Sequence, residues 1–256
     1  MNTTTTILES ARKTILSESE SIAKLVDYLT EDFAKSVDAI YKSKGRLVIT
    51  GIGKSAIIAQ KIVATLNSTG TPSLFLHASE AVHGDLGMVL PEDVIICISK
   101  SGNSPEIKVL VPLLKRFGNT LIGMTSDLNS FLGKESHYKL HAHVDNEACP
   151  NNLAPTNSTT AQLVLGDALA VALMEVRNFK NEDFAIYHPG GALGKKLLLK
   201  VKDMLDTTHA PQVAPDASIK KVIMEISEKG LGVTAVIEDN KVIGIITDGD
   251  IRRILN

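Results

Sequence analysis

The sequence predicts an α/β protein with a five-stranded parallel sheet covered by helices on both faces, followed by a small α+β module. Between residues 46 and 142, short apolar runs alternate with segments of helical periodicity. The runs are apolar throughout rather than at every second position, which is typical of parallel strands buried on both faces. After Gly194 the pattern changes to short helices around two strand-like runs. We therefore expect a single layered domain with a small appended unit.

Residues 6–43 come first and carry apolar residues at helical spacing with charged residues between them, which predicts two amphipathic helices. Strands are expected at 46–50, 73–76, 93–98, 120–125 and 138–142, and helices at 55–67 and 106–117. The segment 156–177 is apolar nearly all round, which predicts a buried helix.

The chain from residue 201 onward predicts the second unit. We expect a helix at 218–229, strands at 234–238 and 241–247 joined at Asp239–Asn240, and a final helix from residue 248. The predicted domains are therefore residues 1–200, including the helices at 6–43, and residues 201–256. A unit as small as the second is near the lower size limit for independent folding and would gain from a partner surface.

Composition excludes several classes of protein. The chain has 27 basic and 29 acidic residues and no long basic stripe, so we expect neither nucleic-acid nor anionic-membrane binding. We see no signal peptide, and no segment that approaches the ~20 apolar residues of a membrane span, which predicts a soluble cytoplasmic protein. Cys97 and Cys149 have no disulfide or metal spacing, so both are expected to be reduced thiols.

The turn at 51–56, Gly-Ile-Gly-Lys-Ser-Ala, follows the first strand and resembles two nucleotide motifs without satisfying either. A Walker phosphate loop would need glycine at the position of Val48. A dinucleotide fingerprint would need an acidic residue closing the next strand about 20 residues later. That strand runs into His77, and the first acid is Glu80. A nicotinamide-dependent oxidoreductase is therefore the least favoured alternative.

The turn at 99–104 follows the third strand and contains three hydroxyl groups, those of Ser99, Ser101 and Ser104. Helix N-termini offer unpaired N–H groups and partial positive charge, and hydroxyl groups add donors at the same point. Beside the lysine of the first turn, this combination predicts a phosphate site. The alternative is that Ser104 is only an N-cap, with Glu106 as a first-turn acid.

Together, the runs at 51–55 and 99–106 resemble the sugar isomerase (SIS) domain, a phosphosugar-binding fold. In more detail the chain is similar to the D-arabinose-5-phosphate isomerases, over about residues 40–200, in the segments 69–72, 83–87, 147–150, 153–156 and 188–194. The resemblance implies interconversion of D-ribulose 5-phosphate and D-arabinose 5-phosphate, the first step toward Kdo in lipopolysaccharide. From the sequence alone, the product could feed either lipopolysaccharide or capsule. It also implies a homotetramer, and the reaction needs no cofactor.

Such an isomerisation moves a proton between C1 and C2 through an enediolate, and therefore needs a base, an acid and groups that stabilise negative charge. The resemblance implies catalytic roles for Lys54, Glu106, Glu147 and His188. Expected substrate contacts are Ser55, Gly70, Thr71, His77, His83, Ser99, Ser101 and Ser104.

The expected roles differ among the four catalytic candidates. Glu147 is the expected base, His188 would open the ring or protonate oxygen, and Lys54 would neutralise phosphate or enediolate charge. Glu106 would take part in proton transfer or only cap its helix. The alternative for Glu147 is a surface loop acid, and for Lys54 a solvated lysine.

Three further expectations depend on the resemblance. Many relatives have Glu or Gln where this chain has Asn103, so hydrogen bonding around the sugar is expected to differ there. Relatives can bind zinc through the residue matching His77, usually to their detriment, so a metal is expected to be inhibitory or absent. The tail resembles a single CBS module, in which residues 244–250 match the nucleotide-contacting turn, so its role is assembly or adenine-nucleotide sensing.

A second functional class stays open from the sequence. A regulatory protein could use the serine turn to sense a phosphosugar without turning it over. Such a sensor would have no need of Glu106, Glu147 and His188 beside the sugar, so these residues favour the enzyme.

Overall fold

The computed structural model describes residues 3–205 and 210–255. Contacts divide the chain into two units, one ending at Leu198 and the other beginning at Leu199. Each unit has its own sheet and its own apolar core.

The first unit is built on a five-stranded sheet in which all neighbouring strands are parallel. Its strand order is β2-β1-β3-β4-β5. The strands are β1 (Leu47–Gly51), β2 (Ser73–His77), β3 (Val94–Ile98), β4 (Thr120–Thr125) and β5 (Tyr138–His141). Each lies within one residue of its predicted range, and the predicted fold class is confirmed. In register, the last residue of β1 is paired with the last residues of β2 and β3, so these carboxyl ends share one edge.

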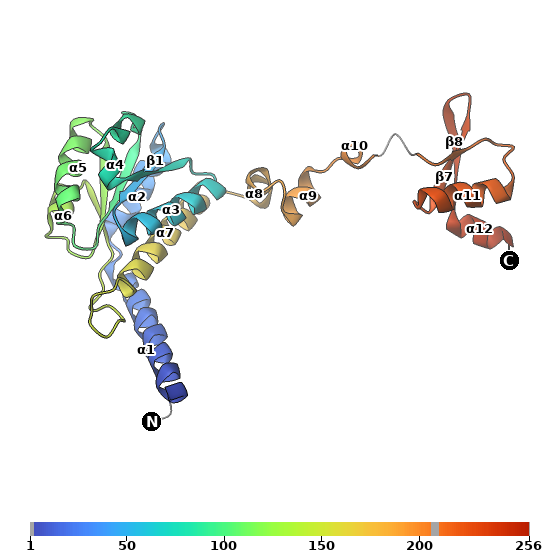
Figure 1. The fold of residues 1–256 in the computed structure, drawn as a ribbon. Helices are drawn as coiled ribbons and strands as arrows, with labels where there is room; N and C mark the ends of the chain where they lie inside the picture. The colour runs from blue at the N-terminus through green and yellow to red at the C-terminus, as the bar shows by residue number, and fades with distance from the viewer. Residues whose placement is uncertain (1–2, 206–209, 256) are drawn as a thin grey trace. The chain divides into compact units, whose positions relative to one another are not determined.

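Helices cover both faces of this sheet (Figure 1). One face packs against α2 (Glu31–Lys42), α3 (Lys54–Ser68) and α7 (Asn157–Val176), and the other against α4 (Ala78–Ala81), α5 (Pro105–Arg116) and α6 (Phe131–Glu135). Along β3, Ile96 belongs to the first core and Ile95 to the second. This double burial is why the strands are unbroken apolar runs in the sequence. Truncating Ile96 to alanine would cost about 2–5 kcal/mol.

The buried helix α7 corrects one expectation. It is long and apolar enough, by length and composition, to cross a membrane, although no segment was expected to approach that composition. In the structure its residues Leu165, Leu169 and Leu173 are buried in the core beneath the sheet, and the helix packs against α3. Its apolar character is therefore explained by burial inside the first unit.

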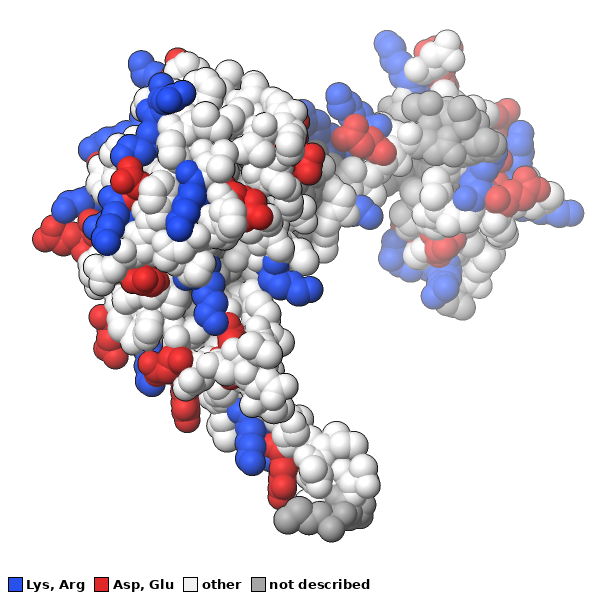
Figure 2. All heavy atoms as spheres, turned by 60° about the vertical axis from the view of Figure 1, so that its left-hand side comes forward, with Lys and Arg blue, Asp and Glu red and all other residues white. Residues whose placement is uncertain are grey.

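The remaining elements of the first unit are short or peripheral. They are α1 (Thr3–Lys24), the 3-10 turns η1 (Leu25–Tyr28) and η2 (Asp85–Met88), α8 (Asn181–Tyr187) and α9 (Ala192–Leu198). The predicted pair of helices before the sheet corresponds to α1 and α2. In α1, the apolar side chains Ile7, Leu8, Ile15 and Leu16 are all more than half exposed. On the face shown in Figure 2, basic and acidic side chains are interspersed.

The second unit is a small α+β module, as predicted. It contains α10 (Val201–Met204), β6 (Gln212–Val213), α11 (Ile219–Lys229), β7 (Val233–Glu238), β8 (Lys241–Thr247) and α12 (Asp248–Leu255). The β7–β8 hairpin turns at Asp239 and Asn240, both with positive φ, as a two-residue turn of this kind requires. The parallel strand β6 was not predicted, because two residues give no periodic signal.

Candidate functional site

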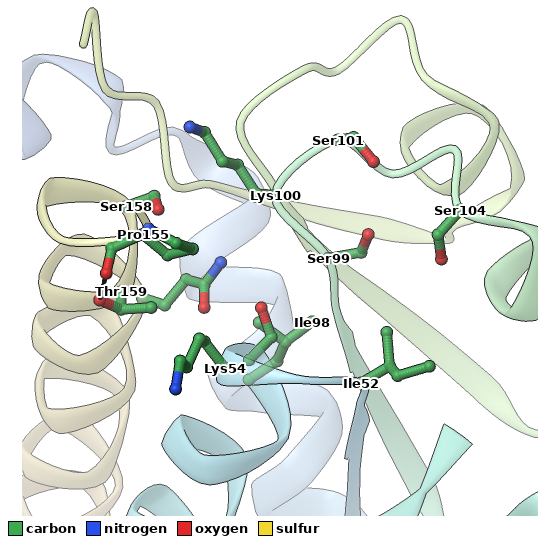
Figure 3. Close-up of a pocket in the computed structure, with 12 residues that line it drawn as sticks. Ile52, Lys54, Ile98, Ser99, Lys100, Ser101, Ser104, Pro155, Ser158 and Thr159 are labelled. Carbon is green, nitrogen blue, oxygen red and sulfur yellow. Dashed lines mark hydrogen bonds between the residues drawn. The ribbon is translucent and has the colours of Figure 1, made fainter. Parts of the chain in front are cut away.

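A cavity of about 330 Å³ lies at the carboxyl edge of the five-stranded sheet (Figure 3). Three segments line it: the turn after β1, the end of β3 with the turn that follows, and the first two turns of α7 together with Pro155 ahead of that helix. In chain order, the lining residues are Ile52, Lys54, Ser55, Ile98, Ser99, Lys100, Ser101, Ser104, Pro155, Ser158, Thr159 and Gln162. This is the place in an open α/β sheet where ligands bind.

The turn after β3 has a fixed backbone. Gly102 has φ +63°, and a Cβ atom there would lie 2.1 Å from Ser130 Oγ, so the position requires glycine. The Gly102 N–H donates to Ser99 Oγ at 3.2 Å, and Thr125 Oγ1 donates to the Lys100 carbonyl at 3.1 Å. The backbone of the turn and the Ser99 hydroxyl are therefore held in place before any ligand arrives.

At the end of this turn, Ser104 is the N-cap residue of α5, but its side chain makes no capping bond among the described residues. Its Oγ atom is buried and has no hydrogen-bond partner in the described parts of the chain. Buried hydroxyl groups in native proteins are normally paired, so an unpaired one beside a cavity is suited to a ligand. The expectation that Ser104 only caps the helix is thus not supported.

At the start of α3, the N-cap residue is Gly53, which has no side chain to satisfy the first N–H groups. Lys54 and Ser55 follow it, and both line the cavity. The N-termini of α3 and α5 therefore direct unpaired N–H groups and partial positive charge toward the same space. Such an arrangement is suited to an anion such as a phosphate group.

Glu147 lies in the loop after β5 and is buried, with 5% of its surface exposed. Its carboxylate accepts hydrogen bonds from Lys100 Nζ (2.5 Å), Ser158 Oγ (2.5 Å), and the backbone N–H groups of Thr156 (2.8 Å) and Ser158 (3.2 Å). Burial by itself raises the pKa of Glu147, but the hydrogen bonds from Lys100, Ser158 and the backbone outweigh it and lower the pKa to about 2. The group is therefore ionised, and two of its partners line the cavity.

Comparisons with known proteins agree with this architecture. The family model for the SIS domain matches residues 39–172, and that for the CBS domain matches residues 201–256. Arabinose 5-phosphate isomerase KdsD of Yersinia pestis is 49% identical over 97% of this chain and 76% of the relative. The protein of the same name from Pseudomonas aeruginosa is 50% identical over 97% of this chain and 77% of the relative.

This chain belongs to the arabinose 5-phosphate isomerase family.

A solved structure from the family shows the fold directly. A protein of E. coli CFT073, determined in complex with arabinose 5-phosphate, superimposes with a TM-score of 0.71 and 42% identity. The match covers 74% of this chain and the whole of the E. coli protein chain.

For an arabinose 5-phosphate isomerase, the cavity collects only part of the predicted site. It brings together Lys54, Ser55, Ser99, Ser101 and Ser104. It also contains residues that the sequence analysis did not name as site residues, namely Lys100, Pro155, Ser158, Thr159 and Gln162. Of these, Gln162 is 1% exposed, and its Oε1 atom has no hydrogen-bond partner among the described residues. For these residues, the one sequence signal was the position of Lys100 between two of the predicted serines.

Seven predicted residues are not among those that line this cavity: Glu147, whose partners line it, Gly70, Thr71, and the four described here. Glu106 is half-buried in the first turn of α5. His188 ends α8, with its ring stacked on Phe184 at 3.8 Å and its Nδ1 atom 2.9 Å from the Phe184 carbonyl oxygen. His77 ends β2, with Nδ1 2.8 Å from Ser79 Oγ, and His83 is exposed. Their roles remain predictions.

Two predicted contacts lie at the opposite edge of the sheet from this cavity. Gly70 and Thr71 precede β2, at the amino end of the sheet, whereas Ser99 follows β3 at its carboxyl end. Their contact with the substrate remains a prediction.

The structure also bears on the expected metal at His77. In residues 3–205 and 210–255, no cluster of three His, Cys, Asp or Glu side chains is arranged to hold a metal, so His77 has no co-ligands there.

Asn103 was expected to change the hydrogen bonding around the sugar. Asn103 binds backbone rather than the cavity: its Nδ2 donates to the Ser101 carbonyl at 3.1 Å, and its Oδ1 accepts from the Phe131 N–H at 3.0 Å. It links the serine turn to α6.

Proposed function

We propose that this protein catalyses the reversible isomerisation of D-ribulose 5-phosphate and D-arabinose 5-phosphate. The observation that carries the proposal is the cavity in which the serine turn, Lys54 and two helix N-termini without side-chain caps converge. Its volume suits a small sugar phosphate. Arabinose 5-phosphate isomerases that share about half of their aligned residues with this chain support the choice of this substrate pair.

In the proposed complex, the phosphate group binds against Ser99, Ser101 and Ser104 and the first N–H groups of α5. This end of the cavity offers hydroxyl and N–H donors, which match the three terminal oxygens of a phosphate. The sugar then extends toward α7, where Thr159 and Gln162 supply polar groups for its hydroxyls.

Proton transfer between C1 and C2 is the chemical step. Hydrogen moves as a proton, so neither sugar is oxidised overall and no redox cofactor is required. We assign the base to Glu147, because it is a buried carboxylate whose hydrogen-bond partners line the cavity. Lys54 is assigned to stabilise the charge of the enediolate oxygens.

Glu106 and His188 complete the proposal from the family resemblance. His188 would open the sugar ring or protonate an oxygen, and Glu106 would assist proton transfer. His77 and His83 would contact the sugar phosphate.

The cellular role is proposed on the same basis. The product would enter Kdo and lipopolysaccharide synthesis in the cytoplasm. The enzyme would act as a homotetramer, and the exposed apolar residues of α1 support an assembly role for that helix. The unit at 201–256 is assigned to assembly, with adenine-nucleotide binding as the alternative; the match to a CBS domain supports either.

The test is proton NMR of D-ribulose 5-phosphate in D₂O with the purified protein and a chelator. We expect arabinose 5-phosphate signals to appear, with deuterium at C2. Binding of the sugar phosphate without exchange or conversion would refute the isomerase and favour the regulatory phosphosugar sensor.

A further inference from the structure

Lys100 connects the phosphate end of the cavity with the buried carboxylate. Its backbone lies between Ser99 and Ser101 in the serine turn, and its side chain lines the cavity. Its Nζ atom lies 2.5 Å from Glu147 Oε1. One lysine therefore has two possible anionic partners, the carboxylate and a bound phosphate.

Of the two charged groups in the pair, Lys100 is the one free to move. Its side chain is 43% exposed, whereas that of Glu147 is 1% exposed. A lysine ammonium sits on a flexible four-carbon stem and can reorient while its backbone stays fixed. Figure 3 shows the Lys100 side chain turned away from Ser101 and Ser104, toward the side on which Ser158 lies.

Glu147 is able to lose this partner without becoming an isolated buried charge. Its carboxylate would keep the hydrogen bonds from Ser158 Oγ, the Ser158 N–H, the Thr156 N–H and Thr156 Oγ1. Removing the only partner of a buried charge is strongly unfavourable, but four remaining donors reduce that cost.

A phosphate monoester competes well for Lys100. It carries a charge approaching −2 at neutral pH, against −1 for the carboxylate, and Coulomb attraction grows in proportion to charge. We propose that Lys100 is shared between Glu147 and the phosphate of the bound sugar, so that phosphate binding draws Lys100 away and leaves Glu147 free to accept a proton. This inference rests on the proposed function.

The release of Lys100 would prime the base. With Lys100 in place, the carboxylate is a weak proton acceptor, because the ion pair stabilises its ionised form. After Lys100 leaves, one of the hydrogen bonds that lower the pKa of Glu147 is lost, and burial, which raises the pKa, is opposed only by Ser158 and the backbone N–H groups. Lys100 is thus a positioning residue for the base, and it couples occupancy of the phosphate end to proton transfer.

The test is a double-mutant cycle with inorganic phosphate as the probe, measured by isothermal titration calorimetry on the full chain. The variants are Lys100→Met, Glu147→Gln and the double variant. The matched control is Lys108→Met, which removes an exposed lysine of α5 that is not among the residues lining the cavity. The neutral double variant contains no unpaired buried charge, so the contribution of Lys100 is measurable there even where Lys100→Met alone folds poorly.

We expect Lys100→Met to weaken phosphate binding by about tenfold or more, in the range of a charge-assisted hydrogen bond. Glu147→Gln frees Lys100 and should strengthen phosphate binding several-fold. The double variant should bind phosphate as weakly as Lys100→Met, because the gain depends on Lys100. Lys108→Met should bind as the unchanged protein does.

Equal phosphate affinity in Lys100→Met and Lys108→Met would overturn the inference. So would a Glu147→Gln variant that binds phosphate less tightly than the unchanged protein, since the ion pair would then be a fixed part of the site. The NMR assay of the unchanged protein decides the isomerase separately. A cycle of the expected form without turnover refutes only the enzyme, and turnover without the cycle refutes only the role of Lys100.

Discussion

Two buried carboxylates lie at opposite edges of the same sheet, and they are paired in different ways. Asp93 directly precedes β3, and its carboxylate accepts from the Arg46 N–H (2.7 Å), Arg46 Nε (3.3 Å), Arg46 Nη2 (2.8 Å) and the Leu90 N–H (2.9 Å). Glu147 is bound at the other edge by one flexible lysine and by the N-terminus of α7.

The difference shows that burial and an ion pair do not by themselves make a site. Arg46 holds Asp93 through a rigid planar group and its own backbone, and that group also donates to the Met88 carbonyl. The pair fixes the strand starts and the loop before β3. Lys100 is instead a single releasable donor beside a cavity that contains unpaired polar atoms. The carboxyl edge is organised for a ligand and the Asp93 network for stability.

The largest expected effect is on activity, where substitutions of the two carboxylates should differ most. Glu147→Gln should lower kcat by about 10³-fold, since a general base contributes 10²–10⁴-fold. Asp93→Asn should leave kcat per folded molecule within a few-fold of the unchanged protein. Both are measured by the NMR assay with matched concentrations of folded protein. A Glu147→Gln variant with kcat within tenfold of the unchanged protein would remove Glu147 from the catalytic role.

For stability, Asp93→Asn should have a larger effect than Glu147→Gln, the reverse of the order expected for activity. Asp93→Asn leaves the Arg46 guanidinium and two backbone donors with a weaker acceptor, and should cost about 3–5 kcal/mol, as broken buried ion pairs do. Glu147→Gln should cost less, because it frees one flexible lysine donor, whereas Asp93 accepts three hydrogen bonds from Arg46. Thermal unfolding midpoints of the two variants check this. Equal losses would mean that both pairs serve mainly to hold the fold together.

The pH dependence of stability sharpens the comparison for Glu147. Its pKa is lowered in the folded protein from 4.5 to about 2, so its contribution is fully present above pH 4.5 and is lost as the pH falls toward 2. A shift of this size corresponds to roughly 3 kcal/mol. Unfolding midpoints between pH 6 and pH 3 should therefore fall less steeply in Glu147→Gln than in the unchanged protein. Parallel curves would contradict the ion-paired state of Glu147.

The smallest effect should have opposite signs for binding and for stability. Ser104→Ala removes a buried hydroxyl that has no partner among the described residues, which should leave stability unchanged or raise it by about 1 kcal/mol. It also removes a proposed phosphate donor, which should weaken phosphate binding by about tenfold. Calorimetry with phosphate and thermal unfolding measure the two quantities. Loss of stability with unchanged binding would place Ser104 in the capping role instead.

The fold was predicted well from the sequence because strands buried on both faces must be apolar at every position, and such runs are easily recognised. Strands such as Val94–Ile98 are apolar at every position, and the hairpin turn needs residues such as Asp239 and Asn240 that accept positive φ. Helices of four to seven residues, among them α4 and α8, are too short to show a period and were not predicted.

The candidate site was predictable only where its residues lie next to one another in the chain. Ser99, Ser101 and Ser104 share one turn, and Lys54 lies in the corresponding turn after the neighbouring strand. The pair of Lys100 with Glu147 joins residues 47 positions apart, and only the tertiary structure brings them into contact.

The most direct measurement is a crystal structure of the protein with D-arabinose 5-phosphate bound. It should show the phosphate group within hydrogen-bonding distance of the turn at Ser99–Ser104, and the carbons C1 and C2 on the side of Glu147. A sugar phosphate bound away from the carboxyl edge, with this cavity empty, would contradict the assignment of the active site.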